Sequence, residues 1–444
     1  MSHPQWVRGL AAQRNFLHNA AQPAHMRSSS RNDGAAVASS AASPLPDRER
    51  WLVRPIAVLA AVLGVLFHAT LFLGRGLVPA DGVLSAPPWA GSIQAPPSNH
   101  LLADQYKTLI PIRQFFTNEV RRGRFPLWNP HLAAGIPSLA AMNVAVLYPN
   151  DLLLTPLGPF HSSGIAAFLK LLLAGVFTML YMRRLGASPP AGLAAALVYS
   201  LSGFMIVWLG HPQVNAAVVL PLLLYFVEGL LAEPLRLRPA IGFAGAYAAL
   251  LLGGHAPTAV HVTLVVAIYL VFRLIERGRR ARLRRTLAWL AGMAAGAAIA
   301  APSLLPYVEY YRLSSSALAS AALDRSASHL APATLAHFLL PFLSGAPHLG
   351  FEQLAARLGL GEIENFNERT GYVGLFTLFV VIVAILRVRT RAARFYGALA
   401  AGSLLVVYGV PPFPALLHAL PITSALSSEV PRSRPSASRP ARRR

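Results

Sequence analysis

The chain has 444 residues, of which 55% are hydrophobic and only 13% are charged, and its mean hydropathy is +0.49. This composition lies outside the range of soluble globular domains and is typical of a polytopic membrane protein. The formal net charge is +22, carried by arginines apart from Lys107 and Lys170. Most of the arginines flank apolar runs, which favours membrane orientation over nucleic-acid binding as the reason for the excess. Because cysteine is absent, disulfides, thiol catalysis and zinc-thiolate sites are excluded.

The first 50 residues are rich in Ser, Ala, Arg and Pro and have no apolar period, so residues 1–50 are expected to be a disordered cytoplasmic tail, with Met26 as an alternative start. The first apolar run begins at Pro55 and is too long for a signal peptide, so we interpret it as a signal anchor. About 20 apolar residues cross a bilayer as a helix, and such runs predict about nine spans, with a range of eight to ten. The runs are 55–74, 161–181, 188–209, 213–232, 239–254, 256–275, 286–306, 371–387 and 393–410.

Arginine clusters follow alternate ends of these runs, and the positive-inside rule places those ends and the N-terminus in the cytoplasm. We therefore predict an all-α, multi-pass membrane domain over residues 51–422, with two long external loops at 75–160 and 307–370. Apolar stretches recur within the first loop. They predict amphipathic interfacial helices and a re-entrant or half-spanning segment at 138–157. Many of the acidic residues fall in the two external loops, which places any chemistry outside: Asp81, Asp104, Glu119, Asp151, Glu309, Asp324, Glu352, Glu362, Glu364 and Glu368.

The stretch 101–137 is the most polar one between apolar spans, and it contains Asp104 between "SNHLLA" and "QYKTLI". Two roles are open for Asp104: a helix N-cap, or a general base that orients or deprotonates a hydroxyl at the membrane surface. The cations that follow it would either anchor lipid headgroups or bind one phosphate of a lipid-linked substrate. These cations are Lys107, Arg113, Arg121, Arg122 and Arg124.

Two further features of the sequence predict corners of the chain. The stretch "RFPLWNPHLAAGIP", with Trp128 and Asn129, is too rich in Pro and Gly for a continuous helix, so we expect a structural corner. His211 and His255 each stand where a span meets the outside with Pro close behind, which favours two similar hydrogen-bonded corners over a metal pair. No metal site is assigned, although a divalent metal is not excluded.

Lys170 lies near the middle of the second predicted span, "AAFLKLLLAGV". An unpaired cation is costly there, so we expect it to face the bundle interior, with Glu228 as the nearest candidate partner in another span. Snorkelling to an interface is the alternative. Phosphate loops of the P-loop or Rossmann kind, GxSxG and HExxH are all missing from the sequence.

With these residues laid out, the chain resembles the YfhO family of bacterial membrane proteins over about residues 55–420. The likeness runs through "ADQYKTLIPIRQFF", "RRGRFPLWNPHLAAGIPSLA", "LYPNDLL", "HPQVNAAVVLPLLLYFVEGLL" and "ERTGYVGLFTL". Its most specific part is an Asp followed by an amphipathic segment, then G-x-F-P-L-W-N-P and G-x-P.

The resemblance implies a GT-C-like glycosyltransferase of the bacterial cytoplasmic membrane, without a cofactor or a nucleic-acid partner. Such enzymes move a sugar from a polyprenyl-phosphate donor to an extracytoplasmic acceptor, here an envelope polymer, a lipid or a protein. In that class an acidic residue of the first external loop is catalytic, and the matching position is Asp104. The donor phosphate would meet the cations named above. The candidate pocket residues are Trp128, Asn129, His211, His255 and Glu309.

A lipid-carrier transporter or envelope-assembly factor without chemistry is the competing hypothesis. A transporter needs polar residues along a path at mid-depth, and apart from Lys170 the predicted spans are nearly devoid of them. Residues 423–444 form a basic Pro/Ser/Arg tract that cannot bury anything and would lie outside on a nine-span count. Because family members are usually longer, we expect a truncated or frameshifted product. The alternative is a native disordered tail, which would lie in the cytoplasm if the number of spans is even. Whether this chain by itself is active is left open.

Overall fold

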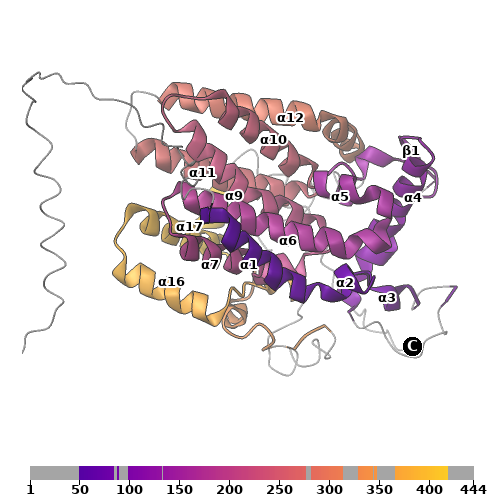
Figure 1. Cartoon of the computed structure of the whole chain (residues 1–444), viewed down its shortest axis with the longest axis horizontal. Helices are drawn as coiled ribbons and strands as arrows, with labels where there is room; N and C mark the ends of the chain where they lie inside the picture. The colour runs from indigo at the N-terminus through magenta and orange to yellow at the C-terminus, as the bar shows by residue number, and fades with distance from the viewer. Residues whose placement is uncertain are drawn as a thin grey trace, which may run out of the picture. The chain divides into compact units, whose positions relative to one another are not determined.

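The computed structural model describes residues 50–84, 88–89, 99–132, 134–276, 282–313, 329–343, 345–347 and 366–418. The tails predicted at 1–50 and 423–444 lie outside the described residues, apart from Arg50, and so does much of the predicted loop 307–370. Nearly all regular structure in the described part is helical (Figure 1).

Each of the apolar runs predicted to span the membrane falls on one helix or on a broken pair. Among the described helices, α6, α9, α11 and α12 are long and apolar enough to cross a bilayer, and α1, α10 and α16 are apolar but shorter. The expected helical membrane-protein fold is confirmed at this level, whereas the number of nine spans stays a prediction. The helices are α1 (Arg50–Leu66) with α2 (His68–Phe72), α6 (Pro159–Arg184), α7 (Pro189–Ser200) with α8 (Gly203–Val207), α9 (Pro212–Leu230), α10 (Leu237–Leu252), α11 (Ala256–Glu276), α12 (Arg282–Arg312), α16 (Leu375–Arg387) and α17 (Arg391–Val407).

The run 188–209 is not one continuous helix, because the chain breaks between α7 and α8. α7 has 12 residues and is therefore about 18 Å long, short of the roughly 30 Å of a bilayer core. At the break, the Gly203 N–H donates a hydrogen bond to the Tyr372 carbonyl oxygen at 2.7 Å. A Cβ at Gly203 would lie 2.9 Å from that same oxygen, so the glycine lets the segment before α16 approach. The break is thus a docking point for a distant segment.

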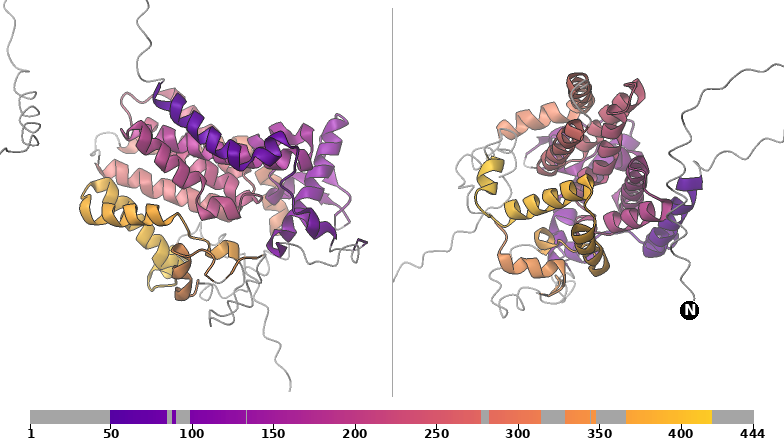
Figure 2. Two further views of the ribbon diagram at one scale, coloured as in Figure 1. Left: turned by 60° about the horizontal axis from the view of Figure 1, so that its bottom comes forward. Right: turned by 90° about the vertical axis from the view of Figure 1, so that its left-hand side faces the viewer.

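Helix α9 lies between two hydrophobic clusters and contributes side chains to both. Val214 and Val218 pack with residues of α1, α6 and α7, whereas Val219 and Leu223 pack with residues of α10 and α11. Helix α12 closes on α10 through small residues, and a Cβ at Gly296 would lie 2.7 Å from a backbone oxygen of α10. In contrast, α16 and α17 have no buried residue and lie at one flank of the bundle (Figure 2).

The first predicted external loop folds into short elements at the end of the bundle where α9 begins. α4 (Ile110–Arg121) is amphipathic and buries Ile112 and Phe116, as expected of the interfacial helix. Two-residue strands β1 (Trp128–Asn129) and β2 (Ile136–Pro137) pair antiparallel and form the predicted corner. Segment 138–157 consists of single turns and α5 (Pro149–Leu154), without a continuous helix. The remaining elements are α3 (Ala80–Leu84), η2 (His100–Leu102), the π-helical turn η3 (Gln105–Leu109), η4 (Ser138–Ala140), η5 (Met142–Val144), η6 (Thr155–Leu157), η8 (Pro332–Phe338), α15 (Phe366–Arg369) and α18 (Phe413–His418).

Candidate functional site

Two histidine corners meet the polar loop at the N-terminal end of α9. His211 directly precedes α9, and His255 directly precedes α11. A Cβ at Gly254 would lie 3.1 Å from Pro212 and 2.7 Å from the Met142 carbonyl oxygen, so the two corners touch each other and the loop. The side chain of Gln105 packs against Gly210 in the same way.

The His255 corner is a hydrogen-bonded helix start, as the sequence predicted. Gly254 has a φ of +93°, which turns the chain into α11. The backbone N–H of Thr258 donates to His255 Nδ1 at 3.2 Å, and the Thr258 hydroxyl lies 2.7 Å from the same nitrogen. His255 therefore caps the first turn of α11.

His211 differs from His255 because its ring makes no such bond. The residue is only 5% exposed, and its Nδ1 has no hydrogen-bond partner in the described part of the chain. Burial lowers the pKa of His211 below its usual value, the nearby Asp104 carboxylate opposes this, and Lys170, Arg113 and His255 lower the pKa further. A neutral imidazole with one unsatisfied ring nitrogen is the result, and Asp104 lies within its electrostatic range.

Asp104 is exposed and does not act as an N-cap, one of the two roles left open by its sequence context. Its backbone has helical angles (φ −60°, ψ −31°), and its side chain accepts no capping hydrogen bond. Asn99 caps the start of this helical run instead, since its Oδ1 accepts the Leu101 N–H at 3.0 Å. No ion pair of Asp104 occurs among the described residues, so its carboxylate faces solvent uncompensated beside the buried His211.

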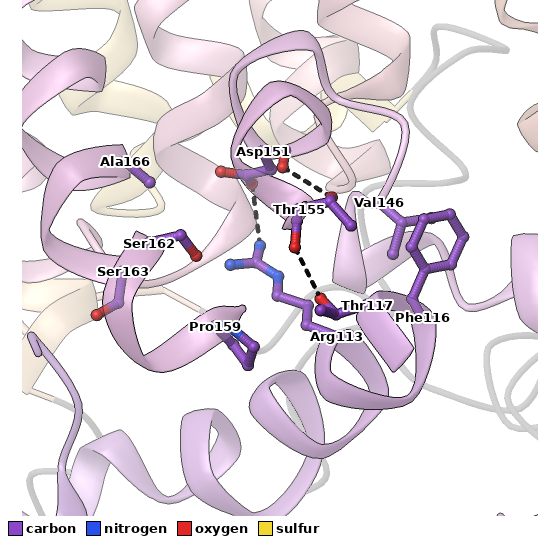
Figure 3. A pocket seen from close by; sticks show the side chains of 10 residues that line it. All are labelled: Arg113, Phe116, Thr117, Val146, Asp151, Thr155, Pro159, Ser162, Ser163 and Ala166. Carbon is purple, nitrogen blue, oxygen red and sulfur yellow. Dashed lines mark hydrogen bonds and ion pairs between the residues drawn. The ribbon is translucent and has the colours of Figure 1, made fainter. Parts of the chain in front are cut away.

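A buried ion triad lies under the loop, and it corrects the partner predicted for Lys170. Asp151 of α5 accepts from Arg113 Nη2 at 3.1 Å and pairs with Lys170 Nζ at 3.4 Å (Figure 3 shows the Arg113 contact). Lys170 is 4% exposed and lies about 16 Å along α6 from its start, so α5 carries a carboxylate into the bundle. Glu228 instead pairs with Arg273 at 2.6 Å. A segment of the predicted external loop, rather than another span, therefore supplies the counter-charge of Lys170.

Most cations predicted to bind a phosphate already have protein partners. Arg113 Nε donates to the Val144 carbonyl in addition to the Asp151 contact. Arg121 donates twice to the Pro156 carbonyl, at 3.1 and 2.6 Å.

Arg122 and Arg124 both pair with Glu119, at 3.0 and 2.7 Å, and Arg124 is the main cause of a lowered pKa of that carboxyl. Lys107 is exposed, with its ammonium 5.9 Å from the ring centre of Tyr106. Of the five predicted cations, Lys107 is the one for which the described structure shows neither a hydrogen bond nor an ion pair.

The other pocket candidates separate into structural and solvent-facing residues. Asn129 is 2% exposed and accepts the His131 N–H at 3.0 Å, so it holds the corner. Trp128 is 55% exposed, and its ring lies on Gly135. Glu309 is exposed near the end of α12. No hydrogen bond or ion pair in the described part joins any of these three candidates to Asp104.

Two buried residues beside His211 were missed by the sequence reasoning. Gln105 follows Asp104 directly and is 8% exposed. Asn215 is fully buried one helical turn after His211; its Nδ2 donates to the Gly253 carbonyl at 2.9 Å, and its Oδ1 has no partner in the described part. The signal for Asn215 was its spacing, because residues four apart share a helix face.

The cavity beside the triad holds about 30 Å³ and is lined by Arg113, Asp151 and Ser162 among others (Figure 3). This volume accommodates one or two water molecules, not a sugar phosphate. The described residues contain no cluster of three or more His, Asp or Glu that could hold a metal ion. No family model, no curated protein and no solved structure matches the chain.

Proposed function

We propose that the protein is a membrane glycosyltransferase that moves a sugar from a polyprenyl-phosphate-linked donor to an acceptor outside the membrane. The observation that carries the proposal is that Asp104 lies close enough to His211 to influence it electrostatically. Asp104 is an exposed carboxylate without an ion-pair partner in the described part, and His211 is a buried, neutral ring beside it. The motif resemblance points to the same aspartate.

The chemistry of an inverting transfer fits such a carboxylate. The acceptor hydroxyl oxygen attacks the anomeric carbon, its proton passes to the Asp104 carboxylate, and the bond from that carbon to the phosphate oxygen breaks. The electron pair leaves with the polyprenyl phosphate. The oxygens of an unpaired carboxylate are open to the acceptor hydroxyl, whereas those of Asp151 already contact two cations.

Two neighbours support the reaction in this proposal. Lys107, three residues after Asp104 and without an ion pair in the described part, offers a positive charge to the leaving phosphate. The unsatisfied Nδ1 of His211 is buried, and in this proposal a local shift at the start of α9 would present it to a sugar or acceptor hydroxyl. The polar groups therefore converge at one end of α9, as an enzyme requires, whereas the mid-depth charge of Lys170 that a transporter would use is neutralised by Asp151.

Asp104→Asn tests the proposal because it keeps the side-chain size and removes the basicity. We expect sugar transfer to the acceptor, measured in membranes from cells expressing the protein, to fall by about 10²-fold or more, the scale of general-base catalysis. The matched control is Asp81→Asn in the same loop, whose carboxylate accepts a local hydrogen bond from the Gly82 N–H. Full transfer by the Asp104→Asn protein at equal membrane abundance would refute the catalytic role.

A further inference from the structure

The C-terminal end of α9, opposite the candidate site, carries a cavity of about 440 Å³ with a strongly basic wall. It lies between the C-terminal ends of α6 and α9 and the N-terminus of α10, and its lining includes Arg184, Arg236 and Arg238. The one carboxylate in the lining, Glu233, accepts from Arg285 at 2.5 Å. In the described part of the chain, none of these three arginines forms an ion pair.

The positions of Arg236 and Arg238 are electrostatically unfavourable without a bound anion. Arg236 is the N-cap of α10 and Arg238 lies in its first turn, where the positive end of the helix dipole repels cations. No side chain caps this helix start. A negative group held there would satisfy both the arginines and the free backbone N–H groups of the first turn. The positive-inside rule explains the side on which these arginines lie, but not their place at a helix N-terminus.

Arg184 faces the cavity in a prearranged position. Its guanidinium lies 5.0 Å from the ring centre of Tyr225, a cation–π distance. A Cβ at Gly229 would be 3.0 Å from Arg184 Nη2, so the glycine allows the guanidinium to lie against α9. A planar donor group that is held in place binds phosphate oxygens with little loss of side-chain entropy.

We infer that this cavity binds the phosphate of an anionic phospholipid. The lipid, rather than a free phosphate, is favoured by the outer face of α10. Leu237 is 73% exposed and Ile241 is 62% exposed, and four-residue spacing puts both on one face beside the basic cavity. One phospholipid molecule would cover both features, with its acyl chains along Leu237 and Ile241 and its headgroup at Arg236 and Arg238. The inference is independent of the proposed glycosyl transfer.

The test uses the purified full chain, delipidated in detergent, with phosphatidylglycerol titrated against the thermal unfolding midpoint. We expect a saturable rise of the midpoint for the native protein and none with phosphatidylcholine. For Arg236→Gln/Arg238→Gln the half-saturating concentration should increase by about 25-fold, because each arginine near a lipid phosphate contributes about fivefold. Both arginines are exposed, so the variant is expected to fold.

Arg122→Gln/Arg124→Gln is the matched control, because it removes the same charge at the other end of the bundle, where both side chains are exposed. This variant should keep the native half-saturating concentration. Equal stabilisation by phosphatidylcholine, or equal weakening in both double variants, would overturn the proposal, since either result means general adsorption. Saturation by inorganic phosphate at the same concentration would also overturn it, because the ligand would then not be a lipid.

Discussion

Replacement of Asp151 by Asn is expected to destabilise the fold strongly, because it leaves two cations without their shared counter-charge. Asp151 and Lys170 are 8% and 4% exposed and lie 3.4 Å apart, which at an effective dielectric constant of about 20 corresponds to about 5 kcal/mol of attraction. Arg113 is 23% exposed and keeps its bond to a backbone carbonyl, so its loss is smaller. Removing one partner of a buried pair costs about 3–5 kcal/mol, and we expect the free energy of unfolding to fall by that amount.

Equilibrium unfolding in mixed detergent micelles, followed by tryptophan fluorescence, measures this change. The double variant Asp151→Asn/Lys170→Met should recover at least half of the loss, because the buried ammonium is then gone. Glu119→Gln is the control: its partners Arg122 and Arg124 are 64% and 61% exposed, so this variant should change stability little. A loss below about 1 kcal/mol in Asp151→Asn would show that Asp151 and Lys170 do not form a stabilising buried ion pair. A double variant no more stable than the single one would show the same.

Two further predictions concern the histidine corners. Because burial lowers the pKa of His211 below its unfolded value of about 6.5, the unfolded chain binds more protons, and stability should fall as the pH decreases below about 6.5; the same measurement on His211→Gln should show a smaller fall. Gly254→Ala should lower the free energy of unfolding by about 1–3 kcal/mol, since its φ is +93° and the new Cβ would meet a backbone oxygen at 2.7 Å. In contrast, Gly245→Ala inside α10, with no atom within 4 Å of the new Cβ, should raise it by about 0.5–1 kcal/mol.

The helices and corners could be predicted from the sequence because they depend on local patterns. Apolar runs of helical length determined the approximate helix positions, and Pro and Gly marked the corner at Trp128 and Asn129. The break between α7 and α8 could not be predicted in this way. It depends on the approach of Tyr372, about 170 residues later in the chain, to the Gly203 N–H.

Two sequence-based expectations at individual residues fail for different physical reasons. A helix N-cap was one of the two roles open for Asp104, but a cap needs a non-helical backbone, and Asp104 lies inside a run that Asn99 already starts. The partner of Lys170 was sought in another span because spans were taken as the only elements at that depth. α5 belongs to the loop and nevertheless brings Asp151 to α6.

The arginines show that the role of a cation cannot be inferred from its position in the sequence alone. Arg113 and Arg121 looked like phosphate ligands, yet they bind groups 38 and 35 positions away, namely Asp151 and the Pro156 carbonyl. Arg236 and Arg238 looked like orientation signals, yet the described structure gives them no counter-charge and puts them at a helix N-terminus. A guanidinium without a protein partner keeps its electrostatic attraction for a ligand. The cations best placed to bind an anion are therefore those whose partners the fold does not supply, and on that ground phosphate binding is expected at the start of α10 and beside Lys107.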